Sequence, residues 1–368
     1  MAPPPPATGA ATAMRRPSLE LGLLVLLLAY PWLPIFDLAA DAAGVPLRLE
    51  PRLVTVFIYA LLVLALNLQV GQAGLLQLGI AAFFGIGAMT TGVLTVTKFP
   101  FQLGFWGALL GAPAAALLAG LLLGAPTLRL RGDYLAIVTL GFGEVVRTVL
   151  LNLEHITDGP RGLNPVAEIW APAGLRTWLA GDDGSRASLL LTYHVALGVL
   201  VAAFVVLRVL ERSRVGRALS ALRDDELAAA CMGLDPARLK LQAFAGGAAL
   251  AGIAGCLYAT NLTTTADPNN YDFNNAIMVL CCLILGGLGT LRGALLGAAL
   301  VIGFDNVLSP LLDRALQQLP GVGGHPLANF SAWRWMLFGL LLVVMMRVRP
   351  AGLFAPATAR AAAGEAAR

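Results

Sequence analysis

The stretch YLAIVTLGFGEVVRTVLLNL, from Tyr134 to Leu153, has the length and composition of one membrane crossing. It nevertheless carries Glu144 and Arg147, three residues apart, near the middle of the run. At 1.5 Å per residue, a fully helical run places Glu144 roughly 15 Å from Tyr134, near the bilayer centre. Charged side chains at that depth are costly and usually face protein or water. This stretch therefore predicts a helix that belongs to a multi-helix membrane protein.

Similar apolar runs recur along the whole chain of 368 residues. Hydrophobic residues make up 58% of the chain and charged residues 12%, about half the share found in soluble domains. We expect an all-α polytopic membrane protein with about eight to ten transmembrane helices, some of them broken or re-entrant. The expected spans are Leu19–Phe36, Leu53–Val70, Leu75–Val96, Leu103–Leu123, Tyr134–Leu153, Ser188–Leu210, Leu241–Leu262, Ala276–Leu288, Gly293–Leu308 and Trp333–Met346.

The two ends of the chain differ in composition from these spans. Residues 1–18 are rich in Pro and Ala, which predicts a disordered N-terminus ahead of a transmembrane domain over 19–349 and a tail over 350–368. Two arginines before an apolar run, with LAADAA at 38–43, also fit a cleavable signal peptide. We favour an uncleaved first helix, because the run is long and another span follows closely.

Basic residues gather in alternate connecting segments. Residues 208–240 contain seven Lys and Arg, whereas 154–187 contain three Arg against five acidic residues. Positive residues favour the cytoplasmic side of a membrane. With about ten crossings, segment 211–240 and both termini are predicted to be cytoplasmic, and loop 154–187 is predicted to lie outside.

The sequence lacks the patterns of several classes of enzyme. It has no G-x-x-x-x-G-K-[ST] phosphate loop, no G-x-G-x-x-G and no G-x-S-x-G. The three histidines are not at metal-ligand spacing, and there is no basic block that would suggest nucleic-acid binding. The cysteines are predicted to be small core residues: Cys231, Cys256, Cys281 and Cys282. We therefore expect no catalytic residue, metal or cofactor in this chain, and a protein that moves a solute without converting it.

Two glycine-interrupted apolar segments stand out, GLLQLGIAAFFGIGA (Gly74–Ala88) and LGGLGTLRGALLGAA (Leu285–Ala299). Broken segments of this kind are typical of discontinuous helices along a transport path. Gly141 and Gly143 could also break their helix and set Glu144 at the positive start of its second half. The alternative is a Glu144–Arg147 pair that holds this helix to its neighbours. The candidate path or pair residues are Gln77, Thr139, Gly141, Gly143, Glu144, Arg147, Gly286, Gly287 and Gly289.

The segment SRVGRALSALRDDELAAACMGLDPARLKLQAF (Ser213–Phe244) has apolar residues at helical spacing and a charged opposite face. It predicts a short cytoplasmic helix around Ala218–Met232, which Gly233 ends. Such a helix fits the groove of a soluble partner better than the headgroup layer, because it offers Ala and acids where a surface anchor would carry large apolar and basic residues.

This segment resembles the E-A-A loop of ABC importer permeases. Three further stretches narrow the resemblance to the LivM-type permeases of branched-chain amino acid importers. They are NLQVGQAGLLQLGIAAFFGIGA (Asn67–Ala88), GDYLAIVTLGFGEVVR with DGPRGL (Gly132–Arg147 and Asp158–Leu163), and LGGLGTLRGALLGA (Leu285–Ala298). The resemblance spans roughly Leu53 to Met346.

The resemblance implies a permease subunit of the bacterial inner membrane, without an ATPase site of its own. Its implied partners are a second, LivH-like permease, two cytoplasmic ATP-binding subunits that bind and hydrolyse ATP, and a periplasmic solute-binding protein. The implied substrates are leucine, isoleucine and valine, with urea, short amides and other small acids as the alternative. The residues that it implies for coupling to the ATPase are Arg217, Arg223, Asp225, Glu226, Ala228, Ala229 and Gly233.

Three positions depart from the family pattern. Ile80 stands where a polar residue is usual, Asp225 where Asn is common, and Gly233 follows Glu226 by seven residues instead of six. Ile80 removes a polar group from a possible path segment, which leaves the substrate open. A stand-alone ion-coupled carrier that titrates Glu144 is the alternative from a different class.

Overall fold

The computed structural model describes residues 50–127, 133–172, 184–265, 267–310, 333–349 and 352–354, with residues 27, 28, 30, 174 and 313. The chain divides into two compact units, Met1–Arg48 and Leu49–Arg368. The expected N-terminal disorder, most of the expected tail and, apart from residues 27, 28 and 30, the expected first span lie outside the described residues. Unit 2 contains every element discussed below.

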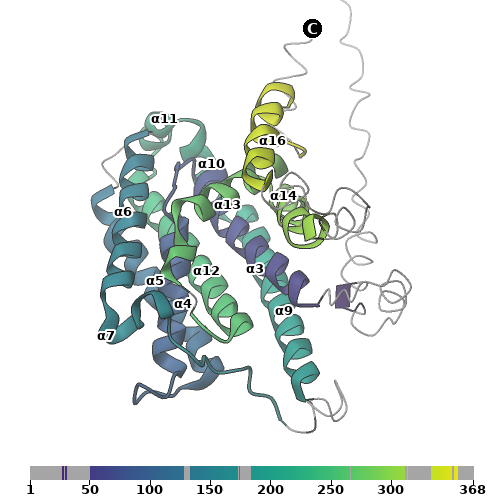
Figure 1. Cartoon of the computed structure of the whole chain (residues 1–368). Coiled ribbons are helices and arrows are strands. Elements are labelled where there is room, and N and C mark those ends of the chain that lie inside the picture. Colours follow the sequence, from purple (N-terminus) through teal and green to yellow (C-terminus); the bar gives the residue numbers. More distant parts are fainter. Residues whose placement is uncertain are drawn as a thin grey trace, which may run out of the picture. The chain divides into compact units, whose positions relative to one another are not determined.

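Helices form all the regular structure of the described residues, as the sequence predicts (Figure 1). In chain order they are α3 (Glu50–Leu66), η2 (Asn67–Gln72), α4 (Ile80–Thr95), α5 (Gly104–Thr127), α6 (Asp133–Asn152), α7 (Glu154–Thr157), η3 (Gly159–Arg161), α9 (Gly184–Arg212), α10 (Arg214–Asp224), α11 (Glu226–Cys231), α12 (Pro236–Leu262), η4 (Pro268–Tyr271), α13 (Phe273–Gly286), α14 (Leu291–Gly303), η5 (Phe304–Leu308) and α16 (Arg334–Val348).

Six of these helical segments are long and apolar enough to cross a membrane. These six segments contain α3, α5, α6, α9, α12 and α14. Three shorter apolar helices lie within α4, α13 and α16. Each expected span from Leu53 onward therefore has a helix in the structure. The expected span Leu75–Val96 differs at its start, because residues 74–79 are not helical and α4 begins only at Ile80.

The core of unit 2 is built around α3, which is buried almost completely from Val54 to Leu66. Helix α12 approaches α4 and α5 closely, because small residues line its inner face. A side chain at Gly252 would meet the backbone of α5 at Ala112, and one at Gly255 would meet the backbone of α4 at Phe84. Close approach of this kind is typical of membrane helices with small residues at their interface.

Glycines of α5 and α14 also lie at contacts between helices. Gly120 and Gly124 face α12, and Gly293 and Gly297 of α14 face the backbone of α13. Three of the four cysteines, Cys256, Cys281 and Cys282, are buried core residues. Cys231 is exposed on α11 and is not a core residue.

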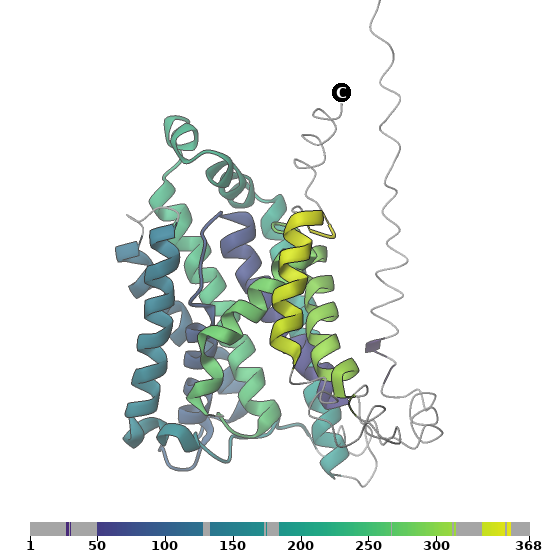
Figure 2. The same cartoon turned by 45° about the horizontal axis from the view of Figure 1, so that its top comes forward.

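Two ends of the helix bundle can be told apart. At one end α10 and α11 project beyond the other helices, and the C-terminal end of α16 lies at this same end (Figure 2). At the other end, the segments that follow α6 and α12 are paired: Thr265 N donates to Leu163 O at 3.1 Å and Val166 N donates to Thr263 O at 2.9 Å. An ion pair of 2.6 Å between Lys98 and Asp158 joins the loop after α4 to the same end.

Candidate functional site

The projecting segment of α10 and α11 is shaped by three side-chain caps. Ser213 Oγ accepts from Gly216 N at 3.2 Å at the start of α10. Asp225 Oδ1 accepts from Leu227 N at 2.8 Å and from Ala228 N at 3.0 Å at the start of α11. Asp235 caps α12 in the same way. Each cap satisfies amide groups that the first turn of a helix leaves unpaired.

The single helix expected around Ala218–Met232 is wrong, because the structure breaks it at Asp225. The backbone of Asp225 is extended, with φ −155° and ψ 112°, so α10 ends before it and α11 begins after it. Aspartate at a helix start competes for the backbone amides of the next turn. The polar pair Asp224-Asp225 therefore marks a corner between two short helices.

Arg223 and Glu226, which the sequence assigns to contacts with an ATPase, both bind within the chain. Arg223 Nη1 donates to Gly71 O, at the end of α3 and η2. Glu226 Oε1 forms an ion pair of 2.7 Å with Lys240 Nζ, whose side chain is only 9% exposed. These two residues therefore connect the projecting segment to the membrane bundle.

The exposed surface of α11 is apolar instead. Leu227 is 66% exposed and Met232 is 84% exposed. Ala228 is exposed beside them, whereas Ala229 is buried. The other two expected coupling residues are also exposed: Arg217, whose Nη1 donates to Arg212 O at 2.9 Å, and Gly233. Gly233 has φ +84° and open space around it, so it is needed for its backbone conformation and not for close approach.

Both glycine-interrupted segments contact Arg223, because Cβ atoms at Gly74 and at Gly289 would each meet its side chain. Gly289 N donates to Asn67 Oδ1 at 3.0 Å, which joins the loop after α13 to η2. Cβ atoms at Gly71 and at Gly289 would both overlap with this junction. Gly287 and Gly289 have φ of +118° and +79°, so the break in this segment is confirmed as a backbone feature. Gly286 ends α13 and packs against the backbone of Gly293.

In the cluster of amide side chains around η2, the sequence analysis singled out only Gln77 and missed Asn67, Gln69 and Gln72. Gln69 Nε2 donates to Phe244 O at 2.9 Å, and Gln72 Nε2 donates to Glu211 Oε1 at 3.1 Å. Asn67 and Gln77 are buried too, and both amide atoms of Gln77 are buried without a hydrogen-bond partner. The recurring amides of N-L-Q-V-G-Q, inside an apolar stretch, were the available signal.

Helix α6 packs against the non-helical stretch that precedes α4. Thr139 Oγ1 accepts from Leu78 N at 3.1 Å and donates to Ala136 O at 3.0 Å. Gly143 faces Gly79 across this contact. The candidate residues Thr139 and Gly143 therefore lie on the α6 face that meets the first glycine-interrupted segment.

Glu144 and Arg147 form an ion pair of 2.9 Å on α6. Arg147 Nη1 also donates to Asn269 Oδ1 at 2.6 Å, so the pair links α6 to η4. Next to them, the buried phenol of Tyr271 donates to Thr265 O. Burial raises the pKa of Tyr271, which keeps this donor protonated.

The expected break of α6 at Gly141 and Gly143 is wrong, because α6 is continuous from Asp133 to Asn152. Neither glycine has a positive φ. A lone glycine weakens a helix by only about 1 kcal/mol relative to alanine, which the flanking apolar turns can tolerate. Glu144 therefore lies inside an intact helix and not at a helix start.

Comparison with known proteins gives a consistent result. A family model described as "Branched-chain amino acid transport system / permease component" matches residues 49–346. The chain is 37% identical over 348 residues to "High-affinity branched-chain amino acid transport system permease protein LivM" of Escherichia coli K12, covering 90% of this chain and 73% of that protein. The protein of the same name from Salmonella typhimurium is 36% identical over the same shares.

A more distant relative comes from an archaeon. "Probable branched-chain amino acid transport permease protein LivM" of Methanocaldococcus jannaschii is 26% identical over 338 residues, covering 80% of this chain and 90% of that protein. No solved structure gave a significant match. The matched region begins with α3 and includes both glycine-interrupted segments, α6 and the projecting helices.

Proposed function

This chain belongs to the family of branched-chain amino acid transport permeases, and from that premise we propose that it imports leucine, isoleucine and valine across the bacterial inner membrane. It acts as the membrane subunit of an ATP-driven importer. The relatives' names state the class of substrate, and this chain matches them along most of its length.

The observation that carries the proposal is the projecting helix pair and its link to the bundle. Leu227 and Met232 form an exposed apolar tip on α11, which suits a hydrophobic groove on a soluble subunit. Arg223, on the preceding helix, binds Gly71 beside the loop of Gly289. A displacement of the tip is thereby passed to both glycine-interrupted segments.

The exposed apolar tip of α11 supports the following proposal for the partners. A pair of cytoplasmic subunits binds and hydrolyses ATP, and one of them receives α11 of this chain. A second, LivH-like permease and a periplasmic solute-binding protein complete the importer. The chain itself holds no cofactor in this proposal.

The orientation rests on charge. The projecting segment and the C-terminal end of α16 carry Arg214, Arg217, Arg223 and Arg347 at one end of the bundle (Figure 2). Basic residues favour the cytoplasm, so this end is cytoplasmic and the paired loops around Thr265 face the periplasm.

The geometry of Glu144 disfavours the carrier that would work alone. A titrating carboxyl in a proton path must exchange its proton with water or solute. Glu144 instead binds Arg147, which also binds Asn269.

The test is reconstitution of this permease with its ATP-binding and permease partners in liposomes, with the binding protein outside. We expect leucine uptake that depends on ATP and is reduced by isoleucine and valine but not by urea. Leu227→Gln and Met232→Gln together should remove the ATP-binding subunits from the purified complex. Ser220→Gln, at an exposed site on α10, is the matched control.

Two results would contradict the proposal. Uptake of leucine by this chain alone would support the independent carrier. Full retention of the ATP-binding subunits by the double variant, with normal uptake, would show that the tip of α11 is not the docking element.

A further inference from the structure

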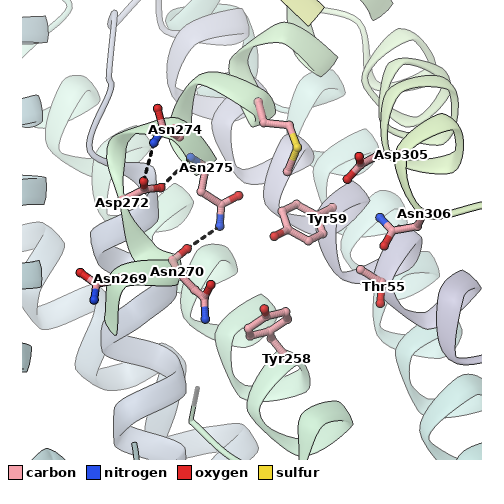
Figure 3. A pocket seen from close by; sticks show the side chains of 11 residues that line it. Thr55, Tyr59, Tyr258, Asn269, Asn270, Asp272, Asn274, Asn275, Asp305 and Asn306 are labelled. Carbon is pink, nitrogen blue, oxygen red and sulfur yellow. Dashed lines mark hydrogen bonds between the residues drawn. The ribbon is translucent and has the colours of Figure 1, made fainter. Parts of the chain in front are cut away.

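A polar cavity of about 330 Å³ lies beside η4, the turn that follows the paired segment of Thr265 (Figure 3). Its walls come from α3, α12, η4, the start of α13 and η5. It is lined by Thr55, Tyr59, Tyr258, Asn269, Asn270, Asp272, Asn274, Asn275, Met278, Asp305 and Asn306. No role has been assigned to it above.

The lining of this cavity favours a positively charged guest. It contains two carboxylates, Asp272 and Asp305, and the side chains of five asparagines, while none of its lining residues is basic. The phenol rings of Tyr59 and Tyr258 add faces that attract cations. A group that donates hydrogen bonds and carries positive charge fits these walls, and an anion does not.

The side chain of Asn275 gives more direct evidence for a guest that donates a hydrogen bond. Its Nδ2 donates to Asn270 O at 2.9 Å, which fixes the orientation of the amide. Its Oδ1 then points toward the Tyr59 side of the cavity (Figure 3) and has no hydrogen-bond partner, although the residue is only 8% exposed. A buried acceptor without a donor is unfavourable, so the site gains when a guest supplies one.

The cavity also reaches into the membrane-spanning part of the chain. At 1.5 Å per residue, Tyr59 lies about 14 Å along α3 from Glu50. Beside Tyr59 and Thr55 (Figure 3), Asp305 and Asn306 belong to η5, a π-helical turn that ends the apolar helix α14. Polar side chains at such depth are costly and usually functional, and π-turns often occur at functional sites.

We propose that this cavity binds the α-ammonium group of the imported amino acid after the binding protein has released it. This inference rests on the proposed function and adds a site within this chain. Asp305 supplies the charge, Asn275 Oδ1 accepts a hydrogen bond, and the rings of Tyr59 and Tyr258 with Met278 contact the apolar side chain. A volume of this size lies at the lower end for small-molecule pockets, as suits a single amino acid.

The experiment uses the complete importer in lipid nanodiscs, with the four native cysteines of this chain replaced by alanine and Asn306→Cys introduced. A cationic and an anionic methanethiosulfonate reagent of similar size are applied from the periplasmic side. Asn152→Cys, at an exposed position at the end of α6, is the control for the intrinsic rates of the two reagents. We expect the cationic reagent to be favoured at Asn306→Cys by about tenfold over the control, equivalent to about 1.4 kcal/mol.

Protection then identifies the guest. Leucine should slow the labelling of Asn306→Cys, whereas 4-methyl-2-oxopentanoate, which has the same side chain but no amine, should not. Asp305→Asn and Asn275→Leu should each raise the leucine concentration needed for protection by about tenfold, as expected when one hydrogen bond to a charged group is lost. Labelling of Asn152→Cys should not respond to leucine.

The outcomes separate the two proposals. Equal protection by the oxo acid, protection by sodium ions alone, or no protection by leucine in an importer that takes up leucine would each overturn the ammonium site and leave the proposed function standing. Protection by methylammonium in an importer that does not take up leucine would refute the proposed substrate and support the site.

Discussion

Several polar side chains of the projecting segment form hydrogen bonds within their own chain. Asp225 is the clearest example, because its Oδ1 accepts from two backbone amides of α11. Asp224, its neighbour, ends α10 and is exposed. The sequence could show that two acids lie here, but not which of them forms the cap, since that depends on where the backbone turns.

This difference gives a matched pair of substitutions. Asp225→Ala should destabilise α11 by about 0.5–2 kcal/mol, the usual loss for an N-cap. Asp224→Ala should have little effect. Hydrogen exchange measured by mass spectrometry on residues 226–231 should be faster in the first variant only. Equal exchange in both variants would show that the cap does not hold α11.

At the scale of elements, the glycines fall into two groups that the sequence does not distinguish. Gly289 has φ +79°, and a Cβ atom there would overlap with Arg223 and the backbone of Gly71. Gly141 lies in the continuous helix α6, with open space around it. Both lie in apolar runs interrupted by other glycines, so composition alone predicts breaks in both. Of these two runs, only the one that contains Gly289 is interrupted, by the loop after α13.

Alanine substitution should separate these two groups. Gly289→Ala should destabilise the protein by about 1–3 kcal/mol, because the left-handed backbone and the close contact both oppose a side chain. Gly141→Ala should be neutral or stabilising by up to about 1 kcal/mol, as in a helix interior. Thermal unfolding of the purified protein in detergent measures both. A lower midpoint for Gly141→Ala would mean that α6 bends at this position during function.

The charge pair of α6 belongs to the same scale, because it joins α6 to η4. Glu144→Gln keeps a hydrogen-bond acceptor for Arg147, and Arg147 keeps its bond to Asn269. We therefore expect ATP-dependent leucine uptake within about twofold of the unchanged protein, since an exposed or half-exposed pair contributes about 0–1 kcal/mol. Loss of uptake in a well-inserted Glu144→Gln protein would instead assign the carboxylate to the transport path.

At the scale of the whole molecule, a movement of α10 and α11 must be transmitted to the other helices of the bundle. Arg223 is the polar side chain of α10 that binds η2, and η2 in turn binds the loop of Gly289 through Asn67. Arg223 therefore connects a projecting helix to both glycine-interrupted segments by direct contacts. This connection should transmit force only when the guanidinium is present.

Arg223→Met should consequently uncouple the importer. The ATP-binding subunits should still assemble and hydrolyse ATP, while leucine uptake per ATP falls by at least about tenfold, the effect of roughly 1.4 kcal/mol. Arg214→Met, an exposed arginine at the start of the same helix, should keep normal coupling. Parallel measurement of ATP hydrolysis and uptake in liposomes decides between them, and equal uptake ratios would refute the role of Arg223.

Much of this architecture is predictable from the sequence, since apolar runs of membrane length give the order and approximate positions of the apolar helices from α3 onward. The family and the projecting segment could be recognised as well. The inward bonds of Arg223 and Glu226, and the buried amides of Gln69 and Gln77, could not. They depend on contacts between residues far apart in the chain, which helical periodicity does not encode.

The last described residues of the chain donate hydrogen bonds to the end of α13, which lies much earlier in the sequence. Leu353 N donates to Leu285 O and Phe354 N donates to Gly286 O, both at 3.0 Å, at the end of α13. During synthesis, α13 leaves the ribosome long before residues 352–354 exist. The last carbonyls of α13 therefore wait for these two donors until residues 353 and 354 have been made, and a chain that stops before residue 353 lacks both bonds.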